Sequence, residues 1–163
     1  MATLSEQEEA IEYFRGKLAQ ENNNAKHHQN LAALLAAQGD IKGAIQHCRQ
    51  AVQLNPLDCK SRNDLGVHLL RLDLWEAAEA CFLLVLKQNP HFLQAHVNLS
   101  AAYASRGDYR AALQHARTAV ELAPHEPSVH RNMAALLDLT GIDATQTPLI
   151  ADRIYQQASA RPC

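Results

Sequence analysis

The sequence predicts an all-α fold, an α-solenoid built from stacked pairs of antiparallel helices. Two observations support this fold class. The 163-residue chain is 47% hydrophobic but only 5% aromatic, and its many alanines suit helices that approach each other closely. In addition, Pro56, Pro90 and Pro124 each lie 34 residues from the next, and a period of this length is typical of helical arrays.

Apolar and small residues recur with the same period. One set of large apolar residues, spaced by 34, comprises Leu31, Leu65, Leu99 and Met133. Four residues after each of these stand Leu35, Leu69, Tyr103 and Leu137. Residues four apart share one helix face, so these pairs predict the buried face of the first helix in each unit. The next register is small in all copies, namely Ala32, Gly66, Ser100 and Ala134, which predicts a close helix crossing there.

Turn residues separate the two helices of each unit. Their register holds Gly39, Asp73, Gly107 and Gly141. Glycine at the end of a helix favours a positive φ angle, so we expect a tight turn at each of these positions. Asp40 and Asp108 follow directly and are predicted to cap the second helix. Each proline then ends a unit, because proline cannot continue a helix interior.

The whole chain, residues 1–163, is expected to form a single domain of such units. Its predicted parts are an N-terminal capping helix over 4–22, repeats over 25–58, 59–92 and 93–126, and a divergent fourth repeat with a C-terminal capping helix over 127–163. In the last part, Thr147 and Pro148 predict the start of the final helix after an extended turn at about 142–147.

This pattern resembles the tetratricopeptide repeat family over most of the chain. In the second unit the matching residues are Leu65, Gly66, Leu69, Trp75, Ala78, Phe82 and Pro90. The resemblance implies a right-handed superhelix in which the first helix of each pair lines a concave groove and the second forms the outer wall. It also implies that the groove binds a protein or peptide.

One polar register on the first helices is the strongest candidate for binding. It holds Asn30, Asp64, Asn98 and Asn132, spaced by 34 residues, and we call it the asparagine column. A similar column is found in the superhelical repeats of O-GlcNAc transferase, where it clamps a peptide backbone. An amide both donates and accepts hydrogen bonds, whereas ionised Asp64 only accepts and favours an N–H or a basic side chain. The alternative is that these residues stabilise packing between repeats.

Other residues of the first helices are predicted to complete the groove. They are Lys60, Asn63, Val67, Gln94, Ala101 and Arg131. Such a surface is shallow, partly apolar and weakly basic, and it suits an extended peptide or a partner helix.

Composition and motifs disfavour several other functions. The net charge of -2 and the pI near 6.5 do not indicate the basic surface that a nucleic-acid-binding protein carries. No run of apolar residues is long enough to span a membrane, and the N-terminus is acidic, so we expect a cytoplasmic protein without a secretory signal. The four cysteines form no C-x-x-C motif, and Cys48 is expected to be buried in reduced form. Five of the nine histidines recur in two registers, namely His28, His96 and His130 in one and His47 and His115 in the other. Residues one repeat apart are too distant to share one metal ion, so no metal site and no cofactor are expected.

The predicted function is therefore a non-enzymatic adaptor or scaffold that binds a protein partner. No nucleophile elbow or glycine-rich phosphate loop occurs in the sequence. One alternative is a structural subunit of a larger ciliary or trafficking-type assembly, for which Leu83, Leu84 and Leu86 offer an outer apolar surface. Another is a regulatory module of a glycosyltransferase-like complex whose catalytic activity comes from a partner chain. The sequence leaves the partner and the oligomeric state open.

Overall fold

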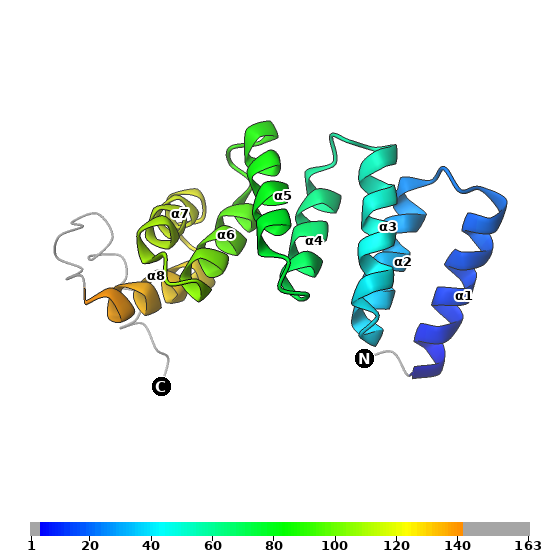
Figure 1. Cartoon of the computed structure of the whole chain (residues 1–163), viewed down its shortest axis with the longest axis horizontal. Coiled ribbons are helices and arrows are strands. Elements are labelled where there is room, and N and C mark those ends of the chain that lie inside the picture. Colours follow the sequence, from blue (N-terminus) through cyan, green and yellow to red (C-terminus); the bar gives the residue numbers. More distant parts are fainter. Residues whose placement is uncertain (1–3, 142–163) are drawn as a thin grey trace. The chain divides into compact units, whose positions relative to one another are not determined.

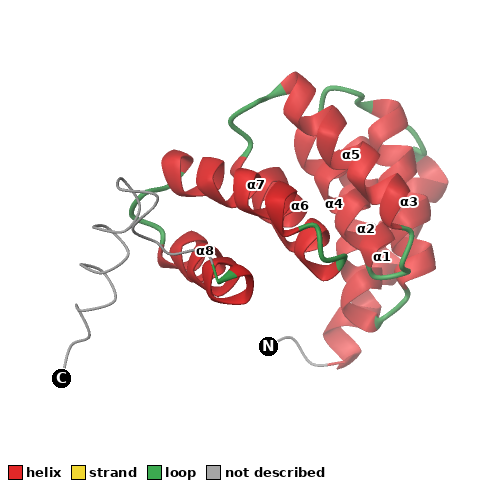
Figure 2. Ribbon diagram, turned by 60° about the vertical axis from the view of Figure 1, so that its left-hand side comes forward, coloured by secondary structure: helices red, strands yellow, loops and turns green. Residues whose placement is uncertain are grey.

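A computed structural model describes residues 4–141, with side chains from residue 6 onwards. Within this part the protein contains eight α-helices and no strand (Figures 1 and 2). The helices divide into two compact units, with the boundary between Phe92 and Leu93. The expected all-α class is confirmed, and each unit is described by itself.

The first unit contains two helix pairs and one additional helix. Its helices are α1 (Leu4–Gln20), α2 (Ala25–Gln38), α3 (Ile41–Leu54), α4 (Cys59–Leu70) and α5 (Trp75–Gln88). Helix α2 packs against α3 and α4 against α5, while α3 also contacts α4 and α1 covers α2. Buried apolar side chains come from all five helices, among them Ile11, Leu31, Ile45, Leu65 and Phe82. The short chain segments between the paired helices make them antiparallel.

The second unit contains one further pair and the helix that follows it. Its helices are α6 (Leu93–Ser105), α7 (Tyr109–Leu122) and α8 (Pro127–Thr140). Helix α6 packs against α7, and α7 against α8. The core of α7 and α8 is closed by apolar residues that include Ala112, Ala116, Val120, Met133 and Leu137.

Side-chain caps explain where most of the helices begin. The carboxylates of Asp40 and Asp108 accept hydrogen bonds from the backbone N–H groups of Gly43 and Ala111, as predicted. Asn24 and Asp58 cap the first helices α2 and α4 in the same way. An N-terminal cap satisfies backbone donors that would otherwise lack a partner, so these residues fix the helix starts.

The predicted turn positions adopt the positive φ angles expected of them. The angles are 91° at Gly39, 79° at Gly107 and 62° at Gly141. The second copy has Asp73 instead, and its φ angle is 57°. A residue with a Cβ atom rarely adopts this conformation. Because Asp73 does adopt it, the backbone turn is preserved even where the glycine is absent.

The predicted close crossing is clearest between α4 and α5. Phe82 is fully buried and its ring lies against Gly66. A Cβ atom added to Gly66 would lie only 2.6 Å from the Phe82 ring. The small residue at this register therefore makes room for an aromatic side chain of the paired helix.

The ends of the predicted units can be compared with the helices. Helix α1 occupies most of the segment expected to cap the N-terminus, and Pro127 stands at the start of α8. Thr147, Pro148 and the predicted C-terminal capping helix lie outside the described residues. The repeat boundaries and the right-handed superhelix stay predictions.

Candidate functional site

The asparagine column occupies the first helix of each pair. Asn30 lies on α2, Asp64 on α4, Asn98 on α6 and Asn132 on α8. The first three are half-buried, and Asn132 is exposed. Within residues 6–141, the side chains of Asn30 and Asn132 form no hydrogen bond. Their amides therefore retain the capacity to donate and accept within this part of the chain.

A pocket lies between α2 and α4 in the first unit, and we call it the α2–α4 pocket. Its volume is about 290 Å³. Its lining combines small apolar residues with polar ones: Gln29, Ala32, Ala33, Ala36, Cys48, Ser61, Asp64 and His68. Asp64, a predicted site residue, thus borders a hollow between two first helices.

Hydrogen bonds fix one wall of the α2–α4 pocket. The side-chain amide of Gln29 on α2 donates to the carboxylate of Asp58 and to the hydroxyl of Ser61. The Ser61 hydroxyl in turn donates to Asp58 over 2.6 Å. Asp58 also caps α4 through the backbone N–H of Lys60. This network holds the two first helices together and keeps Gln29 in one orientation.

Burial changes the titration of two residues that line this pocket. It raises the pKa of Asp64 above its ordinary value, and this effect outweighs the opposing influence of the Lys60 charge and of a hydrogen bond with Asn63. Burial likewise lowers the pKa of His68, while the nearby Asp64 charge acts to raise it. The Nδ1 atom of His68 is covered and has no hydrogen-bond partner within the described residues.

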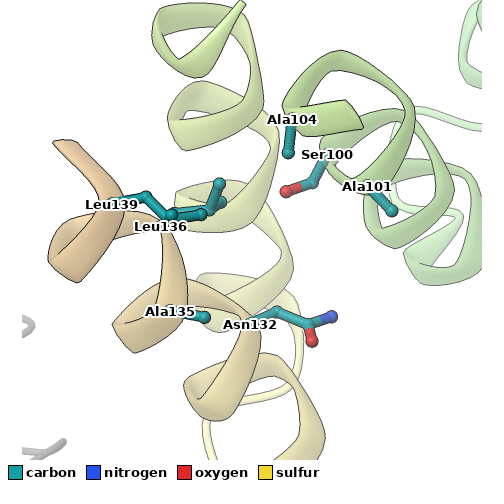
Figure 3. Close-up of a pocket in the computed structure, with 7 residues that line it drawn as sticks. All are labelled: Ser100, Ala101, Ala104, Asn132, Ala135, Leu136 and Leu139. Atoms are coloured by element: carbon teal, nitrogen blue, oxygen red, sulfur yellow. The ribbon is translucent and has the colours of Figure 1, made fainter. Parts of the chain in front are cut away.

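The second unit contains a pocket between α6 and α8, which we call the α6–α8 pocket (Figure 3). Its volume is about 180 Å³. Its lining consists of Ser100, Ala101, Ala104, Asn132, Ala135, Leu136 and Leu139. Two predicted site residues, Ala101 and Asn132, therefore border the same hollow.

The two pockets use equivalent repeat positions. Five lining positions correspond at a separation of 68 residues, or two repeats: 32 with 100, 33 with 101, 36 with 104, 64 with 132, and 68 with 136. The residue types differ at the polar positions, since Asp64 and His68 are replaced by Asn132 and Leu136. The same place in the repeat thus carries an acidic lining in one unit and a neutral lining in the other.

The remaining predicted groove residues vary in exposure. Lys60, Gln94 and Arg131 are exposed, and Val67 is half-buried. Asn63 differs, because its side chain is only 6% exposed. It is therefore covered in this structure and does not present its amide on an open surface.

The histidine registers hide an arrangement that sequence reasoning missed. The Nδ1 atoms of His28 and His47 lie 2.9 Å apart, and those of His96 and His115 lie 3.1 Å apart. Each pair joins the two helices of one repeat. The signal was the shared separation of 19 residues, which recurs 68 positions later. In the described residues, no group of three or more potential ligands could hold a metal ion.

Two further expectations concern cysteine and the membrane. Cys48 is buried, as predicted, with 3% of its surface exposed. None of the helices in the described part has the length and apolar character needed to cross a membrane. The cytoplasmic location stays a prediction.

Comparisons with known proteins agree with this architecture. The tetratricopeptide repeat-containing protein trd-1 of Caenorhabditis elegans is 25% identical over 127 residues. That match covers 77% of this chain but only 16% of the relative, so the chain spans about a sixth of that protein's length.

Solved structures of MamA share the fold at low sequence identity. The crystal structure of MamA has a TM-score of 0.82 and 16% identity, and the match covers 95% of this chain and 91% of that one. MamA from Desulfovibrio magneticus RS-1, residue 41 to the end, has a TM-score of 0.81 and 20% identity, covering 96% and 89%. These similarities establish a helical-repeat solenoid fold.

Family profiles identify the repeats directly. One profile described as tetratricopeptide repeat matches residues 63–127, and a second with the same description matches residues 27–58. Together they cover more than half of the chain, and they include the turn residues Gly39 and Gly107, the caps Asp40 and Asp108, and the small residue Gly66. The chain therefore belongs to the tetratricopeptide repeat family.

Proposed function

We propose that this protein is an interaction scaffold that binds an extended segment of a partner protein along its first helices. The repeats indicate protein partners in general. The observation that carries the finer proposal is that both pockets occur at equivalent positions of the first helices, and that Asp64 and Asn132 of the asparagine column line them. Members of this family are generally non-catalytic, and the proposal involves no reaction.

The chemistry of the column suits an extended backbone. An asparagine amide can donate to a peptide C=O and accept from a peptide N–H. Each such bond contributes about 0.5–1.5 kcal/mol net, so a few of them give moderate affinity for many sequences. Pockets beside the column then select particular side chains of the bound segment.

The state of two column amides, those of Asn30 and Asn132, favours binding over a packing role. A residue that stabilises the contact between repeats is expected to bond to the neighbouring repeat. Asn30 and Asn132 make no hydrogen bond within residues 6–141. In contrast, Gln29 makes bonds of this kind to Asp58 and Ser61. Packing between α2 and α4 thus relies on Gln29, which leaves Asn30 available.

A random peptide library displayed against the full chain tests this proposal. Peptides selected on the wild-type protein should bind less well to the Asn30→Ala/Asn132→Ala double variant. The thermal unfolding midpoint should change little, because neither amide bonds to the rest of the described chain. Affinities are measured by fluorescence anisotropy of the labelled peptides.

The matched control replaces two exposed amides on second helices, Gln46→Ala and Gln114→Ala. This variant should bind the selected peptides as the wild type does. If the control variant loses binding while the double variant of the column retains it, the site on the first helices is wrong.

A second candidate interface lies on α5. Leu83 is 45% and Leu84 is 50% exposed, as expected for the outer apolar surface of a structural subunit. Purification of the full chain from cell extract, with Leu83→Ser/Leu84→Ser and the column variant in parallel, separates the two interfaces. Loss of the same partner only in the leucine variant would favour the structural role.

A further inference from the structure

We propose that the α2–α4 pocket binds a basic side chain of the partner segment, and that arginine fits it best. This inference rests on the proposed function, and it names one side chain that the bound peptide carries. It follows from the donors and acceptors that remain in the pocket once its internal hydrogen bonds are counted.

The donor groups in one pocket wall bond within that wall. The Gln29 Nε2 group donates to Asp58 and to Ser61. The Ser61 hydroxyl hydrogen goes to Asp58 as well. Rotating the Gln29 amide would place its oxygen against the Asp58 carboxylate, which only accepts hydrogen bonds. The donors of these residues are therefore held away from a ligand.

Acceptors remain in the pocket. The Gln29 Oε1 atom accepts no hydrogen bond within the described residues, and the Asp64 carboxylate, which already accepts a bond from Asn63, also lines the pocket. In the described residues Asp64 forms no ion pair. The imidazole ring of His68 also lines the pocket, and a neutral imidazole accepts through the ring nitrogen that lacks the proton. The acceptors of these three residues thus favour a ligand that is rich in hydrogen-bond donors.

The guanidinium group of arginine matches this set. It carries five N–H donors and no acceptor, and it pairs with a carboxylate through two parallel bonds. Asp64 and His68 are four residues apart on α4 and so lie on the same helix face, where one planar group can reach both. The walls are formed by Ala32, Ala33 and Ala36, whose small side chains suit the apolar stem of the arginine.

Two cations lie near the pocket and must be counted. Lys60 is exposed, so water screens its charge, and it forms no ion pair with Asp64. Arg71 acts on His68 through its charge, but its guanidinium donates to the backbone carbonyl of Ala36 over 3.3 Å. Neither group saturates the acceptors of the pocket, and burial of Asp64 makes a further donor favourable.

The α6–α8 pocket provides an internal comparison. Its equivalent positions hold Asn132 and Leu136, and Leu139 adds a further apolar side chain. An amide and two leucines do not favour a cation. The basic side chain should therefore bind in the first unit only.

The direct test is an NMR titration of the full chain with the amide of Nα-acetyl-arginine. Backbone amide signals of residues around the α2–α4 pocket should shift, and those around the α6–α8 pocket should not. The amide of Nα-acetyl-citrulline, a neutral ligand of nearly the same shape, should bind about tenfold more weakly, as should the arginine amide to Asp64→Asn. Asp73→Asn removes one exposed carboxylate of the same unit and should leave binding unchanged.

Equal binding of the citrulline amide, equal binding to Asp64→Asn, or absence of shifts at the pocket would overturn the inference. The peptide library separates this failure from failure of the proposed function. Selected peptides that need the column but carry no excess of basic residues would leave the proposed function standing and refute the arginine site. A library that yields no binding peptide would reject the proposed function, while the titration still decides the chemistry of the pocket.

Discussion

His28 and His47 face each other across the first helix pair, with their Nδ1 atoms 2.9 Å apart. The Nε2 atom of His28 lies 3.2 Å from the carbonyl oxygen of Asn22, which only accepts. His28 Nε2 therefore carries a hydrogen, and its Nδ1 accepts when the ring is neutral. It follows that His47 donates from Nδ1, so one tautomer of each ring is selected.

The burial of His47 at this contact makes the stability of the protein depend on pH. Burial, with a smaller effect of His28, lowers the pKa of His47 below its ordinary value of 6.5. A base whose pKa is lowered by folding binds fewer protons in the folded state. The contribution of neutral His47 to the free energy of unfolding is therefore fully present above pH 6.5. It is lost as the pH falls from 6.5 through the lower pKa of the folded state.

Replacing His47 should weaken this dependence. Urea unfolding of His47→Gln between pH 5 and pH 8 is expected to show a smaller loss of stability on acidification than the wild type. His91→Gln, at an exposed position in a turn, serves as the control and should leave the pH profile unchanged. An unaltered profile in His47→Gln would contradict the assignment.

Helix α5 lacks a cap that its counterparts possess. Leu74 stands where α3 and α7 have Asp40 and Asp108, and it makes no side-chain hydrogen bond. The backbone is similar, with φ and ψ of -89° and 62° at Leu74 against -82° and 70° at Asp108. Leu74→Asp should therefore raise the free energy of unfolding by about 1 kcal/mol, and Asp108→Leu should lower it by a similar amount. Urea denaturation followed by circular dichroism measures both changes.

The contact of Gly66 with Phe82 leaves no room for a methyl group. Gly66→Ala should destabilise the protein by about 1–3 kcal/mol through overpacking, despite the better helix propensity of alanine. At Gly16 nothing lies within 4 Å of an added Cβ atom, so Gly16→Ala should stabilise by up to about 1 kcal/mol. A smaller side chain in the Gly66→Ala/Phe82→Leu variant should recover part of the loss. Equal effects at the two glycines would refute the packing explanation.

The Cys48 thiol should be unreactive in the folded protein. Burial, with a smaller effect of Asp64, raises the pKa of Cys48 to about 12, so almost no thiolate exists at neutral pH. A variant that retains only this cysteine, Cys59→Ser/Cys81→Ser/Cys163→Ser, should react slowly with an aromatic disulfide reagent. The rate should rise sharply in denaturant. Fast labelling without denaturant would show that the thiol is accessible.

The charged Asp64 carboxylate, which is proposed to support binding, should lower the free energy of unfolding. Its raised pKa means that folding favours the protonated carboxyl. The stabilisation from protonated Asp64 is fully present below pH 3.8, the ordinary pKa, and it is lost as the pH rises through the higher pKa of the folded state. The charged carboxylate therefore costs stability at pH 7. Asp64→Asn should therefore be more resistant to urea at pH 7, and the difference should shrink at pH 4. A less stable variant at pH 7 would contradict the burial effect.

Local features of the fold could be predicted from the sequence, whereas contacts across helices could not. Gly39 and Asp40 act within one turn, so their types and spacing predicted both the positive φ angle and the cap. The contact of His28 with His47 depends on how two helices cross, and the burial of Asn63 depends on what covers it. Periodicity alone specifies neither, because it places residues on a face without giving the rotation and depth of that face.

The same limit applies to the candidate site. The 34-residue register placed Asp64 and Asn132 on first helices, where both line pockets. The bonds of Gln29 to Asp58 and Ser61 join α2 to α4, which is the first helix of the next repeat, and no sequence motif predicts them. Without those bonds the pocket would contain unused donors, and its preference for a cation could not have been inferred.

Asp58 links the start of α4 to the contact between α4 and α2. One carboxylate oxygen holds the backbone N–H of Lys60 at the start of α4, and the other accepts from Ser61 and from Gln29 of α2. Loss of the Asp58 carboxylate would therefore remove both the cap of α4 and the hydrogen bonds that tie α4 to α2. The start of one helix and its contact with the neighbouring repeat thus depend on the same side chain.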